Sequence, residues 1–352
     1  MKIVNGVLLL VMLLLIIDDY SSKDYVKPIR KEFQIRAMDI SFLPLIRSHG
    51  VKFKNSRGEV EDPLFSLKRA GVNTIRIRIW NNPLNPLLGV KAMKRFSDEV
   101  KKHGLKVYLT LHYSDTWADP SNQQKPRLWQ NLTKSALNDS VYHFTKSVVD
   151  LFEPDYIQTG NEINNGFLWP EGRNINSKVF KSLIATCAKA VRDSGKKTKI
   201  IMHYSGLAGA NLFFQKLTEL DYDMVGISYY PKWHGNDFEY VYNQMNKLSY
   251  DTHKKIVMAE TAYPFTLDEK DQAKNIIGST DDLASQFPAT PEGQQDYINH
   301  IKRLTNKLTH GAGFCYWGGA WVSTPKHESV WENQALWDHN LHLLPAALAF
   351  KD

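Results

Sequence analysis

The chain has 352 residues, of which 43% are hydrophobic and 12% aromatic, so it carries enough apolar surface for a sizeable core and is not an intrinsically disordered chain. Its net charge of +7 comes without a run of Lys or Arg of the kind that marks a nucleic-acid footprint, and no nucleic-acid partner is expected. The two cysteines, Cys187 and Cys315, lie in a helix-like and a strand-like stretch. One disulfide is arithmetically allowed, but two buried free thiols are the preferred prediction.

The N-terminal segment has the features of an export signal. One Lys is followed by an apolar stretch from Gly6 to Ile17, which is too short to span a bilayer and matches the apolar core of a secretory signal peptide. Residues 1–20 are therefore predicted to be a signal peptide and residues 21–352 the mature domain. The expected protein is a monomer without a stable membrane partner, and it is secreted, periplasmic or held at the cell surface. An uncleaved anchor or a buried N-terminal helix are the alternatives.

Short apolar, β-branched runs then alternate with longer amphipathic stretches along the chain. The runs predict eight strands at Gln34–Met38, Thr74–Trp80, Lys106–His112, Tyr156–Gly160, Lys199–His203, Met224–Tyr229, Lys255–Glu260 and Gly313–Trp317. Helical spacing is found at Asp62–Ala70, Lys91–His103, Val141–Leu151, Ser177–Ser194, Ala210–Leu220, Phe238–Leu248 and Gln294–Leu308. Such alternation indicates parallel strands joined by right-handed crossovers. The predicted fold class is an α/β protein, a single-domain (β/α)8 TIM barrel, in preference to an open doubly wound sheet.

Polar and aromatic residues follow most of the predicted strands, where a barrel of this kind carries its chemistry. They are Asp39, Arg78, His112, Tyr113, Asn161, Glu162, His203, Tyr204, Tyr229, Tyr230, Glu260 and Trp317. The two glutamates end the fourth and seventh strands. Two facing carboxylates suit glycoside hydrolysis, in which a protonated acid donates to the leaving oxygen and an ionised partner attacks the anomeric carbon. Glu162 and Glu260 are the predicted pair.

Other strand-end residues are candidates for supporting these two carboxylates. Arg78 is expected to keep the nucleophilic carboxylate ionised through a charge-assisted hydrogen bond, and Tyr229 to donate to the same group. The amide of Asn161 suits a sugar hydroxyl, and His112 is placed to orient a carboxylate or the substrate. A barrel-core ion pair is the structural alternative for Arg78, and Arg76, on the same face of the strand, is expected to be structural.

Several longer motifs resemble those of the endo-β-1,4-galactanases of glycoside hydrolase family 53. They are "GVNTIRIRIWNNP", "LHYSDTWADPSNQQKP", "QTGNEINNGFLWPEG", "AETAYPF" and "WENQALWD", and the resemblance runs from about residue 37 to residue 350. It implies a retaining (β/α)8 barrel with Glu162 as acid/base and Glu260 as nucleophile. The residues that it places in the sugar subsites are Asn161, Arg78, His112, Asp115, Trp117, Tyr229 and Trp317. The implied partner is a polysaccharide, β-1,4-galactan from pectin or type I arabinogalactan, cut internally.

Some members of that family hold a calcium ion between the last two barrel loops. Asp268, Glu269 and Asp271 offer oxygen ligands here, but we interpret them as solvated surface and predict no metal and no cofactor, since two carboxylates suffice for the chemistry. Two other functions stay open: an endo-glycosidase acting on another β-1,4 polysaccharide such as mannan or cellulose, and a non-catalytic carbohydrate-binding barrel.

Overall fold

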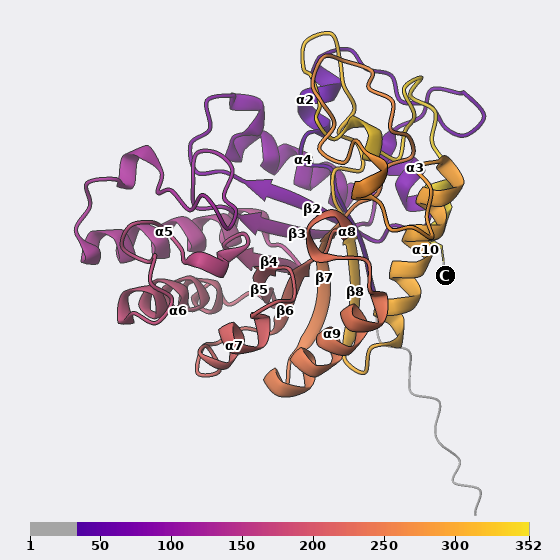
Figure 1. Ribbon diagram of the computed structural model, residues 1–352. Helices are drawn as coiled ribbons and strands as arrows, with labels where there is room; N and C mark the ends of the chain where they lie inside the picture. Colours follow the sequence, from indigo (N-terminus) through magenta and orange to yellow (C-terminus); the bar gives the residue numbers. More distant parts are fainter. Residues whose placement is uncertain (1–33, 352) are drawn as a thin grey trace, which may run out of the picture. The chain divides into compact units, whose positions relative to one another are not determined.

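Eight parallel strands close into a barrel in the computed structural model, which describes residues 34–351 (Figure 1). The strands are β1 (Ile35–Asp39), β2 (Thr74–Ile79), β3 (Lys106–Leu111), β4 (Tyr156–Thr159), β5 (Lys199–Ser205), β6 (Met224–Ser228), β7 (Lys255–Thr261) and β8 (Gly311–Tyr316). Each strand pairs with its neighbour in sequence, and β8 returns to β1, with Ile35 opposite Gly313. The predicted (β/α)8 barrel is confirmed. The predicted signal peptide lies outside the described residues.

Helices follow the strands on the outside of the barrel. They are α2 (Leu43–Ser48), α3 (Pro63–Arg69), α4 (Val90–Lys102), α5 (Lys134–Phe152), α6 (Lys178–Asp193), α7 (Ala210–Gln215), α8 (Pro231–His234), α9 (Phe238–Thr252) and α10 (Pro291–Lys307). Helices α2 and α8 were not predicted. The largest boundary difference is the start of α5, which begins at Lys134 because Thr133 caps it by accepting a hydrogen bond from the Ala136 N–H. Over the part of the chain that the structure describes, no helix has the length and apolar character needed to cross a membrane.

Short 3-10 helices occupy several of the connecting loops. They are η1 (Pro86–Leu88), η2 (Arg127–Trp129), η3 (Ile163–Asn165), η4 (Thr280–Asp282), η5 (Glu332–Gln334) and η6 (Pro345–Phe350). The third of them matters most for function, because it follows β4 directly and begins immediately after Glu162.

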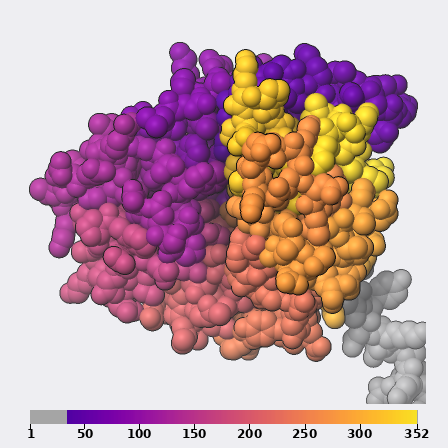
Figure 2. Space-filling model, turned by 45° about the horizontal axis from the view of Figure 1, so that its top comes forward, coloured from indigo at the N-terminus to yellow at the C-terminus, as the bar shows by residue number. Residues whose placement is uncertain are grey.

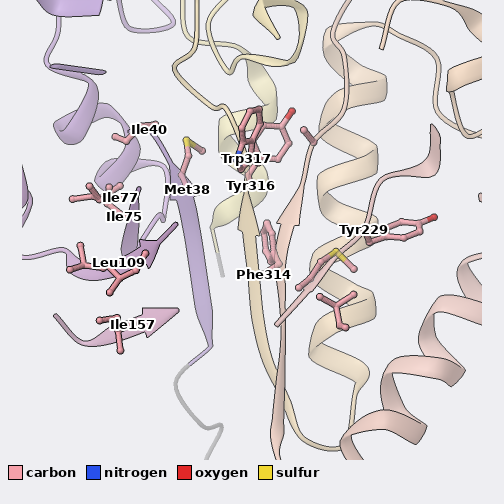
Figure 3. Close-up of a cluster of buried hydrophobic side chains, with 14 of the residues drawn as sticks. Met38, Ile40, Ile75, Ile77, Leu109, Ile157, Tyr229, Phe314, Tyr316 and Trp317 are labelled. Atoms are coloured by element: carbon pink, nitrogen blue, oxygen red, sulfur yellow. The ribbon is translucent and has the colours of Figure 1, made fainter. Parts of the chain in front are cut away.

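The strands bury both faces, and the two faces have different partners. In β2, Ile75 and Ile77 belong to the large apolar cluster between strands and helices (Figure 3), whereas Arg76 points into the barrel. A smaller apolar cluster fills the barrel interior; it consists of Ile35, Ala37, Tyr108, Tyr156, Ile201, Met224, Val257, Ala259, Ala312 and Cys315. Both cysteines are buried and free, as predicted. The charged residues of the interior lie among these buried strands and are held in fixed positions by close packing.

Candidate active site

A cavity of about 640 Å³ opens at the carboxyl ends of the strands, a volume within the usual range of ligand sites. Figure 2 shows the surface on this side hollowed between the violet segments on the left and the orange and yellow segments on the right. The polar and charged residues that line the cavity include Asp39, Arg76, Arg78, His112, Asn161, Glu162 and Glu260. Its aromatic lining is Trp117, Tyr230, Trp233, Trp317, Trp321 and Trp331. The site therefore combines two buried glutamates with flat apolar surfaces.

Glu162 enters the cavity from a sharp turn after β4. Gly160 has φ of +90°, and a Cβ atom there would lie 2.7 Å from Ile163 Cγ2, so only glycine fits. Glu162 itself has φ of +48°, a left-handed conformation that non-glycine residues rarely adopt. Its N–H donates to Nδ1 of His203 at 3.2 Å, and the other ring nitrogen of His203 lies 2.9 Å from the Ser228 hydroxyl. Strain of this kind clusters at functional sites, where the surrounding structure holds it in place.

Glu260 lies near the end of β7 and has a cationic partner. Its Oε1 is 2.7 Å from Nη2 of Arg76, and its Oε2 accepts a hydrogen bond of 3.1 Å from the Tyr230 hydroxyl. Arg76 also pairs with Asp39 at 3.0 Å, and its side chain is only 1% exposed. The guanidinium therefore bridges two carboxylates inside the barrel and favours the ionised form of Glu260.

Two predicted partners of Glu260 were wrong, the arginine by two residues along β2 and the tyrosine by one residue after β6. Arg76 holds the carboxylate instead of Arg78, because Glu260 lies within β7 and not beyond its end, so that the arginine deeper in β2 meets it. Tyr230 donates instead of Tyr229, whose hydroxyl donates to the Gly235 carbonyl. Side chains alternate along the extended backbone after β6, so that Tyr230 lines the cavity, whereas Tyr229 (Figure 3) does not.

The two glutamates have different electrostatic surroundings. Burial, and next the negative charge of Glu260, raise the pKa of Glu162 to about 8, and Glu162 has no cationic partner among the described residues. Burial also raises the pKa of Glu260, but Arg76 and the Tyr230 hydroxyl act in the opposite direction. Near neutral pH, Glu162 therefore keeps its proton, and Glu260 is the member of the pair that ionises. These are the states required of an acid and a nucleophile.

Arg78 lies above aromatic rings and has no carboxylate partner within residues 34–351. Its guanidinium carbon is 4.5, 4.2 and 4.0 Å from the ring centroids of Phe42, Trp80 and Trp117. Burial lowers the pKa of Arg78 to about 10. It therefore stays charged at neutral pH and presents its donors at the cavity wall.

The other predicted subsite residues divide into two groups. Within the cavity, the Nδ2 of Asn161 donates to the Ala118 carbonyl at 2.8 Å, and His112 accepts from the Ala118 N–H at 3.0 Å. Burial lowers the pKa of His112, which is consistent with a neutral ring. Asp115 does not line this cavity; it lines a neighbouring groove, where its carboxylate accepts from the N–H groups of Asn82 and Arg127. Tyr229, described above, does not line the cavity either.

The aromatic wall is wider than the sequence prediction. Trp117 and Trp317, two of the predicted subsite residues, line the cavity, and Trp117 stacks on Trp321 at 5.8 Å between ring centroids. Trp317 lies 4.5 Å from Trp331, which the motif "WENQALWD" contains. Trp233, on α8, was missed, because nothing in its local sequence indicates that a short helix would bring it to the cavity.

The loops after β7 and β8 do not fit a bound calcium ion. Asp271 uses its Oδ1 to accept from the Ala273 N–H and its Oδ2 to accept from the Ser329 N–H, both at 2.8 Å. Lys270, two residues after Asp268, donates through Nζ to the carbonyl of His339. An ammonium group at this junction disfavours a second cation. Nowhere in residues 34–351 do three His, Cys, Asp or Glu side chains converge as potential metal ligands.

We expect the thermal stability of this protein to be insensitive to calcium. Asp271 and Lys270 connect the two loops directly, so we expect these contacts to hold the loops together without help from a divalent ion. Thermal unfolding should give the same midpoint in excess EDTA and in millimolar calcium. A calcium-dependent rise of the midpoint would contradict this interpretation, since a ligand stabilises the state to which it binds.

Arg76 and Arg78 offer a matched pair of variants. In Arg76→Met, Asp39 and Glu260 lose their shared cation, and loss of one partner of a buried ion pair costs about 3–5 kcal/mol of stability. Without the guanidinium, the pKa of Glu260 rises further, so the acidic limb of the pH profile of kcat/KM should move to higher pH. Arg78→Met removes no ion pair, only a weaker charge interaction with Glu260, and should move that limb less. An unmoved limb in Arg76→Met would contradict the assignment of Arg76.

An eight-stranded parallel barrel with two differently ionised glutamates at its mouth is the arrangement of a barrel glycoside hydrolase. A family model described as Glycosyl hydrolase family 53 matches residues 35–350, so the chain belongs to that family and is a glycoside hydrolase. The arabinogalactan endo-β-1,4-galactanase of Cellvibrio japonicus is 31% identical over 338 residues, which cover 89% of each chain.

Solved structures agree with this membership. The family 53 catalytic domain of Ignisphaera aggregans superposes with a TM-score of 0.85 at 35% identity, covering 90% of this chain and 95% of that one. A structure from a study of two fungal β-1,4-galactanases gives a TM-score of 0.79 at 26% identity, covering 89% and 98%.

Proposed function

We propose that this protein hydrolyses internal β-1,4-galactosidic bonds of galactan or type I arabinogalactan by double displacement. Glu162 donates a proton to the leaving oxygen, while Glu260 attacks the anomeric carbon and forms a glycosyl-enzyme. Glu162 then removes a proton from the water that releases the sugar. Galactanase names among the relatives support the substrate, and the cavity with its tryptophan faces suits a sugar chain.

One observation carries the proposed mechanism: Arg76 bridges Glu260 and Asp39, whereas Glu162 is buried with no cationic partner among residues 34–351. Of two chemically identical groups, this leaves one ionised and one protonated. A pair with one ionised and one protonated carboxyl group supplies the nucleophile and the general acid that the first step needs at the same time. A carbohydrate-binding barrel without catalysis would gain nothing from this strained and buried pair.

A panel of polysaccharides tests the substrate. We expect release of reducing ends from debranched galactan, with oligosaccharide products of several sizes that indicate internal cleavage. Activity on mannan or cellulose with none on galactan would overturn the proposed specificity. Tight binding of galactan without any release of reducing ends would favour the non-catalytic barrel.

We propose in addition that the protein is exported before it acts. The apolar stretch from Gly6 to Ile17 supports this, and so does a polymeric substrate that is too large to enter a cell intact. The mature N-terminus, sequenced from protein recovered outside the cytoplasm, should lie near residue 20.

A further inference from the structure

A second groove adjoins the catalytic cavity on the side of Glu162. It has a volume of about 550 Å³, and Pro120 and Ser121 line both spaces. Its other walls come from the chain that follows Glu162 directly, between Asn164 and Ile175, and include Trp169 and Arg173. The groove is therefore continuous with the site and is built by the same turn that carries the proposed acid.

The groove presents a flat platform and several amides. The guanidinium carbon of Arg173 lies over the Trp169 ring, 4.8 Å from its centroid, so the guanidinium stacks on the indole and the stacked pair contributes to the groove wall. Asn164, Asn165 and Asn174 line the same space. An aromatic face surrounded by amide and guanidinium donors suits the apolar face and the hydroxyl rim of a sugar ring.

Hydrogen bonds fix the platform before any ligand arrives. The Trp169 indole N–H donates to the Asn165 carbonyl at 3.0 Å, and the Trp169 backbone N–H donates to the Gln123 carbonyl at 2.7 Å. The Asn165 amide donates in turn to the Pro120 carbonyl at 2.9 Å, which ties the loop after β3 to the loop after β4. A preformed surface of this kind spends little free energy on ordering when it binds.

We infer that this groove holds the leaving-group portion of the galactan chain, the sugars on the reducing-end side of the cleaved bond. The inference rests on the proposed function. The acid must touch the leaving oxygen, so sugars beyond that oxygen continue past Glu162. The groove is lined by the chain that follows Glu162, whereas Arg76 and Glu260 line only the main cavity. Trp169 and Arg173 thus determine how much binding energy the enzyme obtains from the sugars on the reducing-end side of the cleaved bond.

Two substrates separate this role from a merely structural one. Galactan fills the groove, whereas a nitrophenyl β-1,4-galactobioside has an aryl leaving group in place of sugars. Binding energy from remote sugars raises the rate only where those sugars are present. In Trp169→Ala we expect kcat/KM on galactan to fall about tenfold and kcat/KM on the aryl galactobioside to change by less than about twofold. Arg173→Ala, an exposed side chain whose loss should not affect folding, should show the same selectivity with a smaller loss.

The controls make each outcome decisive. Lys216→Ala, on the surface after α7, should leave both rates unchanged. Wild-type rates on the two substrates in Trp169→Ala and Arg173→Ala would overturn the inference and leave the proposed function intact. An equal loss on both substrates would also overturn it, because it would indicate a displaced Glu162. If the wild-type protein hydrolyses neither substrate, the proposed function itself fails.

Discussion

Glu260→Ala is expected to abolish hydrolysis of galactan, with kcat falling by about 10⁴-fold or more. In the proposed mechanism this carboxylate forms the covalent bond to the sugar. Its ion pair with Arg76 holds it in position in the cavity, and no other group described there can replace it in this role. A water molecule in the space left by the carboxylate would not be held in position to attack the anomeric carbon. The measurement is release of reducing ends from galactan under saturating substrate.

The fold should survive this substitution. Arg76 keeps Asp39 as a partner when Glu260 is removed, so no buried cation is left without a carboxylate. Thermal unfolding should therefore remain cooperative. Glu269→Ala, an exposed glutamate in the loop after β7, serves as the matched control and should retain full activity. A Glu260→Ala protein that releases products at the wild-type rate would rule out this residue as nucleophile.

Glu162→Gln is expected to be slow but more stable than the wild type. General acid catalysis contributes about 10²–10⁴-fold to such rates, so kcat on galactan should fall by a factor in that range. The alkaline limb of the wild-type pH profile should lie near the Glu162 pKa of about 8, because the acid must hold its proton. That limb should disappear in the variant, which has no proton to lose.

The gain in stability follows from the direction of the pKa shift. The pKa of Glu162 is about 8 in the folded protein and about 4.3 in an unfolded chain, so unfolding releases a proton between these two values. Stability therefore falls as the pH rises through this window, and by pH 7 the cost is on the order of 3 kcal/mol. Glutamine avoids this cost. Its advantage in denaturant unfolding should be largest above pH 7 and should vanish near pH 4. Equal stability of the two proteins at pH 7 would contradict a buried, proton-binding Glu162.

The barrel could be predicted from the sequence because its strands are buried on both faces. "TIRIRI" and "KVYLTL" contain apolar or β-branched residues at most positions, and glycines or asparagines mark the turns before them. Each predicted strand was found with ends that differ by at most two residues. Helix α5 was the main boundary error, because its first turns depend on a capping threonine and not on apolar periodicity.

The two glutamates could be located from the sequence, but their partners could not. A strand pattern indicates the face to which a side chain points, but it does not indicate which residues of different strands lie at the same height along the barrel axis. Arg76 and Arg78 face the same side of β2, and only the stagger of the barrel places the first one against Glu260. Similarly, Tyr229 and Tyr230 are adjacent in the sequence, yet only Tyr230 faces the cavity and donates to Glu260.

The loops that complete the cavity were the least predictable part. Trp233 and Trp321 reach it from connections whose course depends on tertiary contacts, such as the stacking of Trp321 on Phe42 at 4.4 Å between ring centroids. The groove at Trp169 was missed for the same reason, although "GFLWPEG" stood within a recognised motif. Local sequence indicates neither which loops meet nor which faces they leave open.

The stereochemistry of the first product tests most directly whether Glu162 and Glu260 act as one retaining pair. Proton NMR during the first minutes of galactan cleavage follows the new anomeric centre before it mutarotates. Two successive displacements at that carbon should give the β-anomer first. Initial appearance of the α-anomer would mean that water attacks directly, and Glu260 would then not be the nucleophile.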